Sequence, residues 1–518
     1  MKTISHSLAA HVAAAAVFAS IATAQTILTV PQTFPTIGAA IAAAPSQPQP
    51  VVIEVMPGDY LESLSITLDG LVVRRAPGAT QDVRILPPLG SFGVEFTGVS
   101  RATRVEDLVF KGQSGNIVSL VQVSGASPTI LRCRIADNEA PFGAGITVNP
   151  TFPISNIVGP LFVDCDVENN TADIDGGGAE VAWTTRFENC RFTGNTAVAH
   201  GAGMFVSFFS QSPTFYVDVV DSVFADNGLG LTPQEGGAFY VQDAIPATRW
   251  FDCRLQNNRA EFGGGGVSRG RGLQMDYCVV IANTATQTLG GGLVIETGFD
   301  QNGVEQHTTG VLTSTKLIEN VAQTGAGGLL IRRGGTDPVG QALAELYMVD
   351  DLVANNAVLS GQGGGMLVDA ANVVAVKTTV TANSATGASG RGVWVAASTS
   401  FVGFDTSILW SNAGSVQRNQ IAGVAGAGIV VQYSDLQGLI AGAFPGASNI
   451  NLVPQFINIF GVPENSYFLQ ASSPCVNTGN PAVALDGSES TQSSLTPDSG
   501  VADMGFHRNA LPVAPINL

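Results

Sequence analysis

The sequence predicts an all-β fold, a parallel β-solenoid in which coils of about 30 residues follow one another along one axis. Three observations predict it. An asparagine recurs along the chain at spacings from 25 residues (Asn170 to Asn195) to 37 residues (Asn283 to Asn320). Small and apolar residues precede each asparagine at fixed distances, and a glycine cluster follows it. The recurring asparagines are Asn138, Asn170, Asn195, Asn227, Asn258, Asn283, Asn320, Asn356, Asn383 and Asn412.

The residues before each asparagine have strand periodicity. Five positions earlier the chain carries a small side chain in nine of ten repeats: Cys133, Cys165, Cys190, Ser222, Cys253, Cys278, Thr315, Asp351, Thr378 and Ser407, with Asp351 the exception. Three positions earlier all ten are apolar: Ile135, Val167, Phe192, Phe224, Leu255, Val280, Leu317, Val353, Val380 and Leu409. Two residues of separation puts both side chains on one face of a strand.

A glycine cluster and a short apolar run follow each asparagine, as in "GGGAEV" at 176–181 and "GGGMLV" at 363–368. Each coil is therefore expected to contain a strand ending at Asn, a glycine turn with positive φ, a second strand and a variable return. Helical periodicity is nearly confined to 36–44, "TIGAAIAAA", which we expect to cap the first coil.

Stacking gives the repeated side chains a role. Equivalent residues lie about 4.8 Å apart in neighbouring strands, so an inward asparagine can donate its amide to the next and satisfy buried backbone groups. The cysteines would then form a buried row of free thiols, because side chains pointing the same way strain a disulfide. Cys475 lies outside this row.

The ends of the chain differ from the repeats. Residues 1–24 read as a secretory signal peptide with Ala22-Thr23-Ala24 as the cleavage site, leaving 518 − 24 = 494 residues. We expect a β-helix domain over 25–460 and an irregular C-terminal cap or sorting segment over 461–518. No later apolar run reaches the length of a membrane helix; "IAGVAGAGIVV" at 421–431 is too short. The expected location is extracellular or at the cell surface.

The composition limits the partners. With 23 Lys and Arg against 41 Asp and Glu, the net charge is −18, which argues against nucleic acid and disfavours polyanions. Only His200, His307 and His507 lie beyond the leader and no CxxC pair exists, so no zinc site or other cofactor is expected.

Several segments resemble known families. The entry "VPQTFPTIGAAIAAAPSQPQPVVIEVMPGDYLESLSI" (30–66) is similar to right-handed parallel β-helix proteins of the pectin lyase-like superfamily. "FTGN" (192–195) and "GGAFYV" (236–241) resemble repeats of polymorphic outer-membrane proteins. The end, with "YFLQASSPCVNTGNP" (467–481) and "VADMGFHR" (501–508), looks like the C-terminal portion of choice-of-anchor Q proteins. The resemblance implies a right-handed helix with at least ten coils, and it leaves function open, because this fold hosts many activities.

The catalytic motifs of those families do not carry over. There is no NTD, GHG or RIK motif, no pectate lyase motif, and "AHGAG" around His200 is a partial match only. The turn "PGDYLE" (57–62) matches pectin methylesterases, but their two downstream acids are missing and the turn is structural in that family. No catalytic residue is therefore assigned.

Acidic pairs are candidate sites. Asp164 and Asp166 flank inward Cys165, so both are expected to face solvent on one strand, at a spacing that inverting glycosidases can use. Neighbouring coils place Arg, Asn or Asp there, which favours an exposed ion ladder. Asp173 and Asp175 could offer oxygen ligands to calcium but lack a known loop spacing. Asp350 precedes Asp351, which occupies a small-residue position and needs a partner.

Three further features of the sequence offer no assignable site. "GGGG" (263–266) is not followed by a helix, as a phosphate loop requires. The four tryptophans fall at different coil positions and form no sugar platform: Trp183, Trp250, Trp394 and Trp410. Insertions near 207–217, 297–312 and 334–346 could border a groove.

Two hypotheses follow. The first is a structural, adhesive or glycan-contacting solenoid at the cell surface, with a polysaccharide or surface component as partner. The second is a polysaccharide lyase or glycoside hydrolase that uses acids on the solenoid wall. The missing motifs favour the first.

Overall fold

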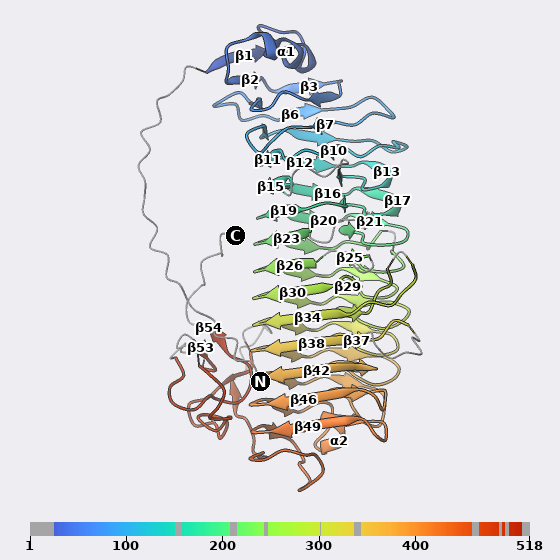
Figure 1. Cartoon of the computed structure of the whole chain (residues 1–518), viewed down its shortest axis with the longest axis vertical. Coiled ribbons are helices and arrows are strands. Elements are labelled where there is room, and N and C mark those ends of the chain that lie inside the picture. Colours follow the sequence, from blue (N-terminus) through green and yellow to red (C-terminus); the bar gives the residue numbers. More distant parts are fainter. Residues whose placement is uncertain are drawn as a thin grey trace.

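The computed structural model is a right-handed parallel β-helix, and it describes residues 25–150, 158–207, 215–230, 232–242, 247–300, 302–335, 343–457, 466–485, 489–492 and 497–509. The expected signal peptide (1–24) and parts of the predicted insertions lie outside these residues. Figure 1 shows the coils stacked along one axis, with the C-terminal segment beside the last of them. Within the described ranges the strands form three long parallel sheets.

Sheet A has 15 strands in the described ranges, and each belongs to one coil. They are β1 (Thr26–Val30), β2 (Val51–Val55), β5 (Val72–Arg75), β8 (Arg104–Glu106), β11 (Thr129–Leu131), β15 (Leu161–Val163), β19 (Thr185–Glu188), β23 (Tyr216–Val220), β26 (Ala247–Phe251), β30 (Gly272–Asp276), β34 (Thr308–Thr313), β38 (Ala344–Val349), β42 (Ala371–Val376), β46 (Phe401–Asp405) and β49 (Gly428–Gln432).

Sheet B carries the strands that lead to the asparagines, 14 in the described ranges. They are β3 (Gly58–Tyr60), β6 (Val83–Ile85), β9 (Val109–Lys111), β12 (Arg134–Ala136), β16 (Asp166–Glu168), β20 (Arg191–Thr193), β24 (Val223–Ala225), β27 (Arg254–Gln256), β31 (Val279–Ile281), β35 (Lys316–Ile318), β39 (Leu352–Ala354), β43 (Thr379–Thr381), β47 (Ile408–Trp410) and β50 (Asp435–Leu436).

Sheet C follows the glycine clusters with 13 strands, again counting the described part of the chain. They are β4 (Leu64–Ile66), β7 (Val94–Thr97), β10 (Val121–Ser124), β14 (Ile146–Asn149), β18 (Ala179–Val181), β22 (Met204–Val206), β25 (Phe239–Val241), β29 (Gly266–Ser268), β33 (Leu293–Glu296), β37 (Leu329–Arg332), β41 (Met366–Asp369), β45 (Val393–Val395) and β48 (Ile421–Gly423).

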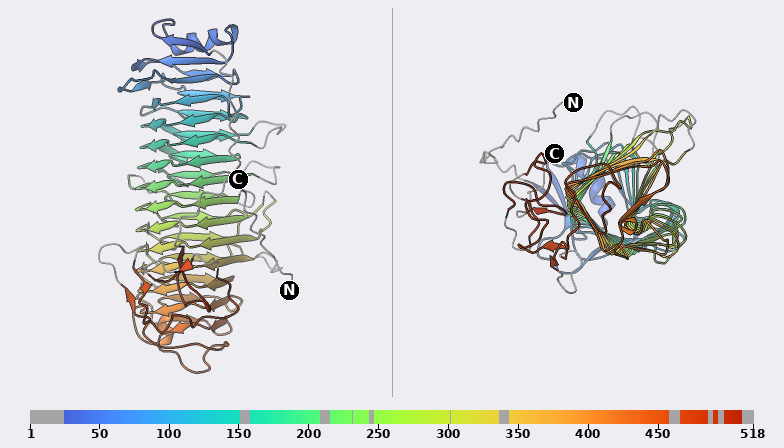
Figure 2. Two further views of the ribbon diagram at one scale, coloured as in Figure 1. Left: turned by 90° about the vertical axis from the view of Figure 1, so that its left-hand side faces the viewer. Right: turned by 90° about the horizontal axis from the view of Figure 1, so that it is seen from below.

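Short strands join the coils between sheets B and C. They are β13 (Glu139–Phe142), β17 (Thr171–Asp175) and β21 (Thr196–Ala197), then β28 (Arg259–Ala260), β32 (Thr284–Ala285), β36 (Val321–Ala322), β40 (Ala357–Val358) and β44 (Ser384–Ala385). The sequence analysis expected a variable segment between the second strand of one coil and the first strand of the next. In the structure that segment contains the strands of sheet A, so part of it is regular. Figure 2 shows the closed cross-section from below.

The predicted stacking is confirmed inside the solenoid. From Asn170 to Asn383 each Nδ2 donates to Oδ1 of the asparagine one coil on, at 2.9–3.1 Å. The row extends beyond the prediction, starting at Asn116, whose Nδ2 donates to Asn138, and ending through Gln420. All six cysteines are free and buried.

The glycine clusters have two roles. The first glycine of a cluster adopts positive φ, as Gly176 does at +69°. A later one permits close backbone approach: a Cβ on Gly178 would lie 2.4 Å from the carbonyl oxygen of Gly203 in the next coil. The sequence prediction identified the first role and not the second.

The N-terminal end is capped by α1 (Ile37–Ala43), preceded by Thr36 as N-cap. The carboxylate of Glu62, at the end of the "PGDYLE" turn, accepts the amides of Ile37 at 2.9 Å and Gly38 at 2.7 Å. This turn therefore fastens the cap to the first coils. A second short helix, α2 (Gln417–Gln420), lies in the last coil.

The C-terminal segment, 466–509, packs on the outer face of sheet B over the last coils (Figures 1 and 2). Its strand β52 (Phe468–Leu469) pairs antiparallel with β51 (Phe456–Ile457), which precedes the segment, and within the segment β53 (Glu489–Ser490) pairs antiparallel with β54 (Arg508–Asn509). Phe468 and Phe506 bury the outward side chains of Ile318 and Leu352. The outward side of sheet B thus changes along the axis from exposed charges to a covered apolar face. No helix among the described residues is long and apolar enough to cross a membrane.

Candidate functional site

Asp164 and Asp166 do not share a strand, contrary to the sequence prediction. Asp166 begins β16, whereas Asp164 lies at the corner before it with φ of +53°. Asp and Asn adopt this left-handed conformation more easily than other non-glycine residues, which explains the acid at position 164. Asp164 accepts from Nδ2 of Asn189 at 2.6 Å, and Asp166 lies 3.7 Å from the Arg191 guanidinium. The exposed ladder that the sequence favoured is present.

Asp173 and Asp175, the second acidic pair, have different surroundings. Asp173 is exposed, while Asp175 is buried and its Oδ1 lies 2.7 Å from Nδ1 of His200. The His200 backbone amide donates to the same oxygen at 3.0 Å. Asp175, His200 and Glu235 occupy equivalent places in three successive coils, joined by parallel bridges. Within the described residues no group of three or more His, Cys, Asp or Glu is arranged to hold a metal ion.

Beside this row, an arginine crosses the outer face of sheet C. The Arg269 guanidinium donates to Glu296 Oε2 through Nε at 3.0 Å and to the Tyr240 hydroxyl through Nη1 at 2.5 Å, and it pairs with Glu235 at 2.6 Å. Burial acts to lower the pKa of Arg269, but the neighbouring acids and Tyr240 outweigh it and raise that pKa. The guanidinium therefore stays charged.

The histidine and the arginine meet at one ring. The ring centroids of His200 and Tyr240 lie 4.6 Å apart, and Cζ of Arg269 lies over the Tyr240 ring, 5.4 Å from its centroid. Below them, burial raises the pKa of Glu180. We call Asp175, His200, Glu235, Tyr240 and Arg269 the sheet C cluster. The sequence analysis considered Asp175 as a possible calcium ligand and His200 as part of a partial motif, but it did not connect either residue with Glu235, Tyr240 or Arg269.

The predicted insertions near 207–217, 297–312 and 334–346 follow β22, β33 and β37 in the sequence and precede strands of sheet A. Their described ends therefore lie between sheets C and A and not beside Asp166. In the described part of the 297–312 insertion, the Glu305 carboxylate accepts hydrogen bonds from Oγ1 of Thr297 at 2.5 Å and from Nε of Arg333 at 3.0 Å.

A hollow of about 190 Å³ lies on the outer face of sheet A. Its lining comes from β38, β42 and β46: Glu345, Leu346, Tyr347, Asn372, Val374 and Phe401. Tyr347 is 43% exposed and Phe401 39%, so both aromatic side chains are accessible from solvent. Gly403 pairs with Val374, and a Cβ on Gly403 would lie 3.3 Å from Cε1 of Phe401, so the Phe401 ring covers the place where Gly403 lacks a side chain.

The sequence analysis did not identify Tyr347 and Phe401, because it considered only tryptophans as a platform for sugars. Trp183 and Trp250 are buried in the core. The signal that could have found the hollow is the outward position of sheet A, where Tyr347 and Phe401 stand in coils that elsewhere carry charged residues such as Asp218 and Arg249.

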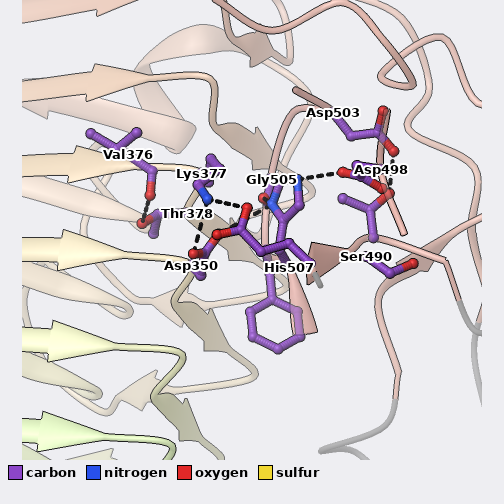
Figure 3. Close-up of polar contacts among 12 residues, drawn as sticks. Asp350, Val376, Lys377, Thr378, Ser490, Asp498, Asp503, Gly505 and His507 are labelled. Carbon is purple, nitrogen blue, oxygen red and sulfur yellow. Dashed lines mark hydrogen bonds and ion pairs between the residues drawn. The ribbon is translucent and has the colours of Figure 1, made fainter. Parts of the chain in front are cut away.

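Asp350 and Asp351 have different surroundings. Asp351 points into the solenoid, fully buried, and accepts the Thr315 amide at 2.7 Å. Burial raises its pKa well above the usual value, so it is held as a neutral acid. Asp350 points outward beneath the C-terminal segment, where Figure 3 shows it with Lys377, His507 and Asp498. No motif or period in the sequence connects these residues.

The sequence matches no protein-family model and no curated protein. Solved structures overlap it weakly. A pectate lyase has 12% identity and a TM-score of 0.32, covering 95% of this chain and 98% of the lyase. The catalytic domain of a GH87 α-1,3-glucanase also has 12% identity and a TM-score of 0.32, covering 82% and 68%. A PL6-family alginate lyase has 10% identity and a TM-score of 0.27, covering 80% and 81%. No inference about ligand or activity follows from likeness of this degree.

Proposed function

We propose that the protein is an exported, surface or extracellular β-helix that holds a glycan on the outer wall of sheet A. The observation that carries the proposal is the hollow between Tyr347 and Phe401. The apolar C–H faces of a sugar ring pack well on aromatic rings, which supply rigid contact area. The Glu345 carboxylate and the Asn372 amide border the same hollow and are suited to sugar hydroxyls.

The hollow has features of a shallow binding site for one sugar unit of a longer chain. It is smaller than pockets that enclose a drug-sized ligand, and its two rings sit on strands two coils apart, β38 and β46. A polymer lying along the stacked coils would contact both rings. The leader-like residues 1–24 and the C-terminal resemblance to choice-of-anchor Q proteins support an exported location for this contact.

Glycan arrays and affinity electrophoresis with the purified protein test the proposal. Tyr347→Ala or Phe401→Ala is expected to weaken binding about tenfold, the loss of one aromatic contact. Tyr216→Ala is the matched control, because Tyr216 is also an exposed aromatic residue of sheet A, at 41%. Binding that is absent from every glycan, or unchanged in both variants, would remove this function.

A second candidate, a polysaccharide lyase or hydrolase, is favoured by the sheet C cluster. Asp175 fixes Nδ1 of His200, and the other ring nitrogen, Nε2, makes no hydrogen bond within the described part of the chain. Such a histidine can transfer a proton. The charged Arg269 beside the Tyr240 hydroxyl can stabilise negative charge and assist a second proton transfer.

Turnover assays on acidic and neutral polysaccharides distinguish the two functions. The enzyme hypothesis expects activity that His200→Ala abolishes and that His307→Ala leaves intact. Sugar binding without turnover on any polymer, with the Tyr347 and Phe401 variants impaired, supports the first function and excludes the second.

A further inference from the structure

Lys377 is a cation enclosed between the solenoid and the C-terminal segment. It occupies the corner between β42 and β43, and its side chain is 3% exposed. Its Nζ lies 3.0 Å from Oδ2 of Asp350 one coil earlier and contacts Oε2 of Glu489 in β53. An amine is thus held against two carboxyl groups, one from each part of the protein.

The surroundings of Lys377 contain more acids than bases. His507 bridges Asp350, at 3.3 Å from Nδ1 to Oδ1, and Asp498, at 2.8 Å from Nε2 to Oδ2 (Figure 3). Asp503 lies close by and accepts from Thr491. The carboxyl groups of Asp350, Glu489, Asp498 and Asp503 therefore face two cations in a buried space, and an excess of buried negative charge favours protonation of an acid.

The acids are not equivalent. Burial, and then the charge of Asp350, raises the pKa of Glu489. The pKa of His507 is raised to about 9, against the effect of burial, by its bonds to Asp350 and Asp498. Glu489 is therefore the group suited to be neutral, and Asp350, whose Oδ2 lies 3.0 Å from Nζ of Lys377, is the group placed to accept a proton from the amine.

The Lys377 amine is protonated in the resting state. Burial acts to lower the pKa of Lys377, but Asp350 and Glu489 outweigh it and raise that pKa. The ammonium is therefore the resting form. Because Nζ contacts carboxylate oxygens on both sides, a proton can pass from nitrogen to oxygen without leaving the cluster, and this exchange yields a neutral amine beside a neutral acid.

We propose that Lys377 and Glu489 condense to an isopeptide bond that joins the C-terminal segment covalently to the solenoid. Lys377 Nζ attacks Cδ of Glu489, and Asp350 takes a proton from the attacking nitrogen. Asp350 then returns that proton to the departing hydroxyl, the Cδ–O bond breaks, and one water leaves. An N–C bond replaces a C–O bond, nothing is oxidised or reduced, and no co-reactant is needed.

Enclosure makes the reaction reasonable in water. Condensation of a free amine and acid is disfavoured in dilute solution, but groups held in reacting contact have effective molarities of about 10⁵–10⁸ M. The side chains of Asp350 and Glu489 are 7% and 9% exposed, so the water that would hydrolyse the amide has little access. The bond would close a covalent loop from 377 to 489, which would keep the segment on sheet B during unfolding.

Mass spectrometry of the purified full chain decides the proposal. The chain is expected to be lighter by one water than its sequence requires from its determined N-terminus. Lys111, Lys316 and Lys377 are the lysines beyond the leader, so trypsin is expected to skip Lys377 and yield a branched peptide carrying Glu489. An unmodified mass with cleavage after Lys377 would overturn the proposal, as would a branch to Asp350 instead.

Variants test the chemistry. Lys377→Met should restore the full mass, whereas Lys316→Met, which removes a lysine that lies 5.4 Å from the Phe506 ring in the same region, should keep the deficit. Asp350→Asn should leave the two side chains in place but unjoined. The wild-type mass needs no variant to fold, so a poorly folding variant cannot hide the outcome.

Discussion

Two buried polar systems hold this molecule together, and they differ in every respect but burial. Inside the solenoid, a column of neutral amides passes a hydrogen bond from coil to coil, at 2.9 Å from Asn227 to Asn258 and again from Asn258 to Asn283. Under the C-terminal segment, Lys377 and His507 sit among acids that occur once. The periodic system supplies stability without titration, whereas the single cluster concentrates charge where protons and bonds can change.

Asn258→Ala is expected to have the largest effect, because it breaks the column in the middle. The change removes the acceptor of the Asn227 backbone amide, at 3.1 Å, and the donor to the Phe224 carbonyl, at 2.9 Å. Each buried group left unpaired costs about 1–3 kcal/mol, so the free energy of unfolding should fall by about 4 kcal/mol. Chemical denaturation measures this loss.

The control for this change is Asn302→Ala, an asparagine in an exposed turn. Hydrogen exchange should also rise in the coils next to position 258 and not at the solenoid ends, because solenoid coils are stabilised by their neighbours. Equal effects of the two variants would show that the column does not stabilise the core.

Raising the pH should weaken the cluster and leave the column unaffected. The pKa of His507 is about 9 when folded, raised from 6.5. Its contribution is complete below pH 6.5 and is lost as the pH rises through 9, a change of about 3 kcal/mol. Intrinsic-rate-corrected hydrogen exchange at pH 7 and pH 10 should therefore show opening confined to 466–509. His507→Gln should remove the difference, and a uniform response along the chain would contradict it.

The contrast also separates what the sequence could predict from what it could not. The Asn column, the free thiols and the β-helix followed from residues that repeat in one register. Asn116 and Gln420 extended the column unnoticed, because neither stands in the repeated motif. The cluster joins Asp350 and Lys377 to Glu489 and His507, over 100 residues away, with no period to reveal it. One signal could have been detected in the sequence. Leu352 and Ile408 are apolar at outward positions of sheet B, which indicates that another segment buries them.

Asp351→Ser should stabilise the protein, by about 1 kcal/mol at pH 7. Asp351 occupies the small-residue row, where Ser407 shows that a hydroxyl can accept the equivalent amide, from Thr378 at 3.1 Å. Burial raises the pKa of Asp351, so the folded state holds its proton and loses stability as the pH rises above the ordinary value of 3.8. Thermal melts should show the gain at pH 7 and a smaller one at pH 4; a loss at both would mean that the carboxyl is needed.

Asp166→Asn should have the smallest effect on stability and on any activity, although Asp166 belongs to the pair that the sequence analysis considered for catalysis. Its side chain is 52% exposed, and its ion pair with Arg191, itself 65% exposed, spans 3.7 Å. Exposed pairs contribute about 0–1 kcal/mol, and water replaces the lost partner at once. Denaturation midpoints and any glycan binding or turnover should match the wild type within error. A large loss of turnover would instead place the active site on the outer face of sheet B, away from the sheet C cluster.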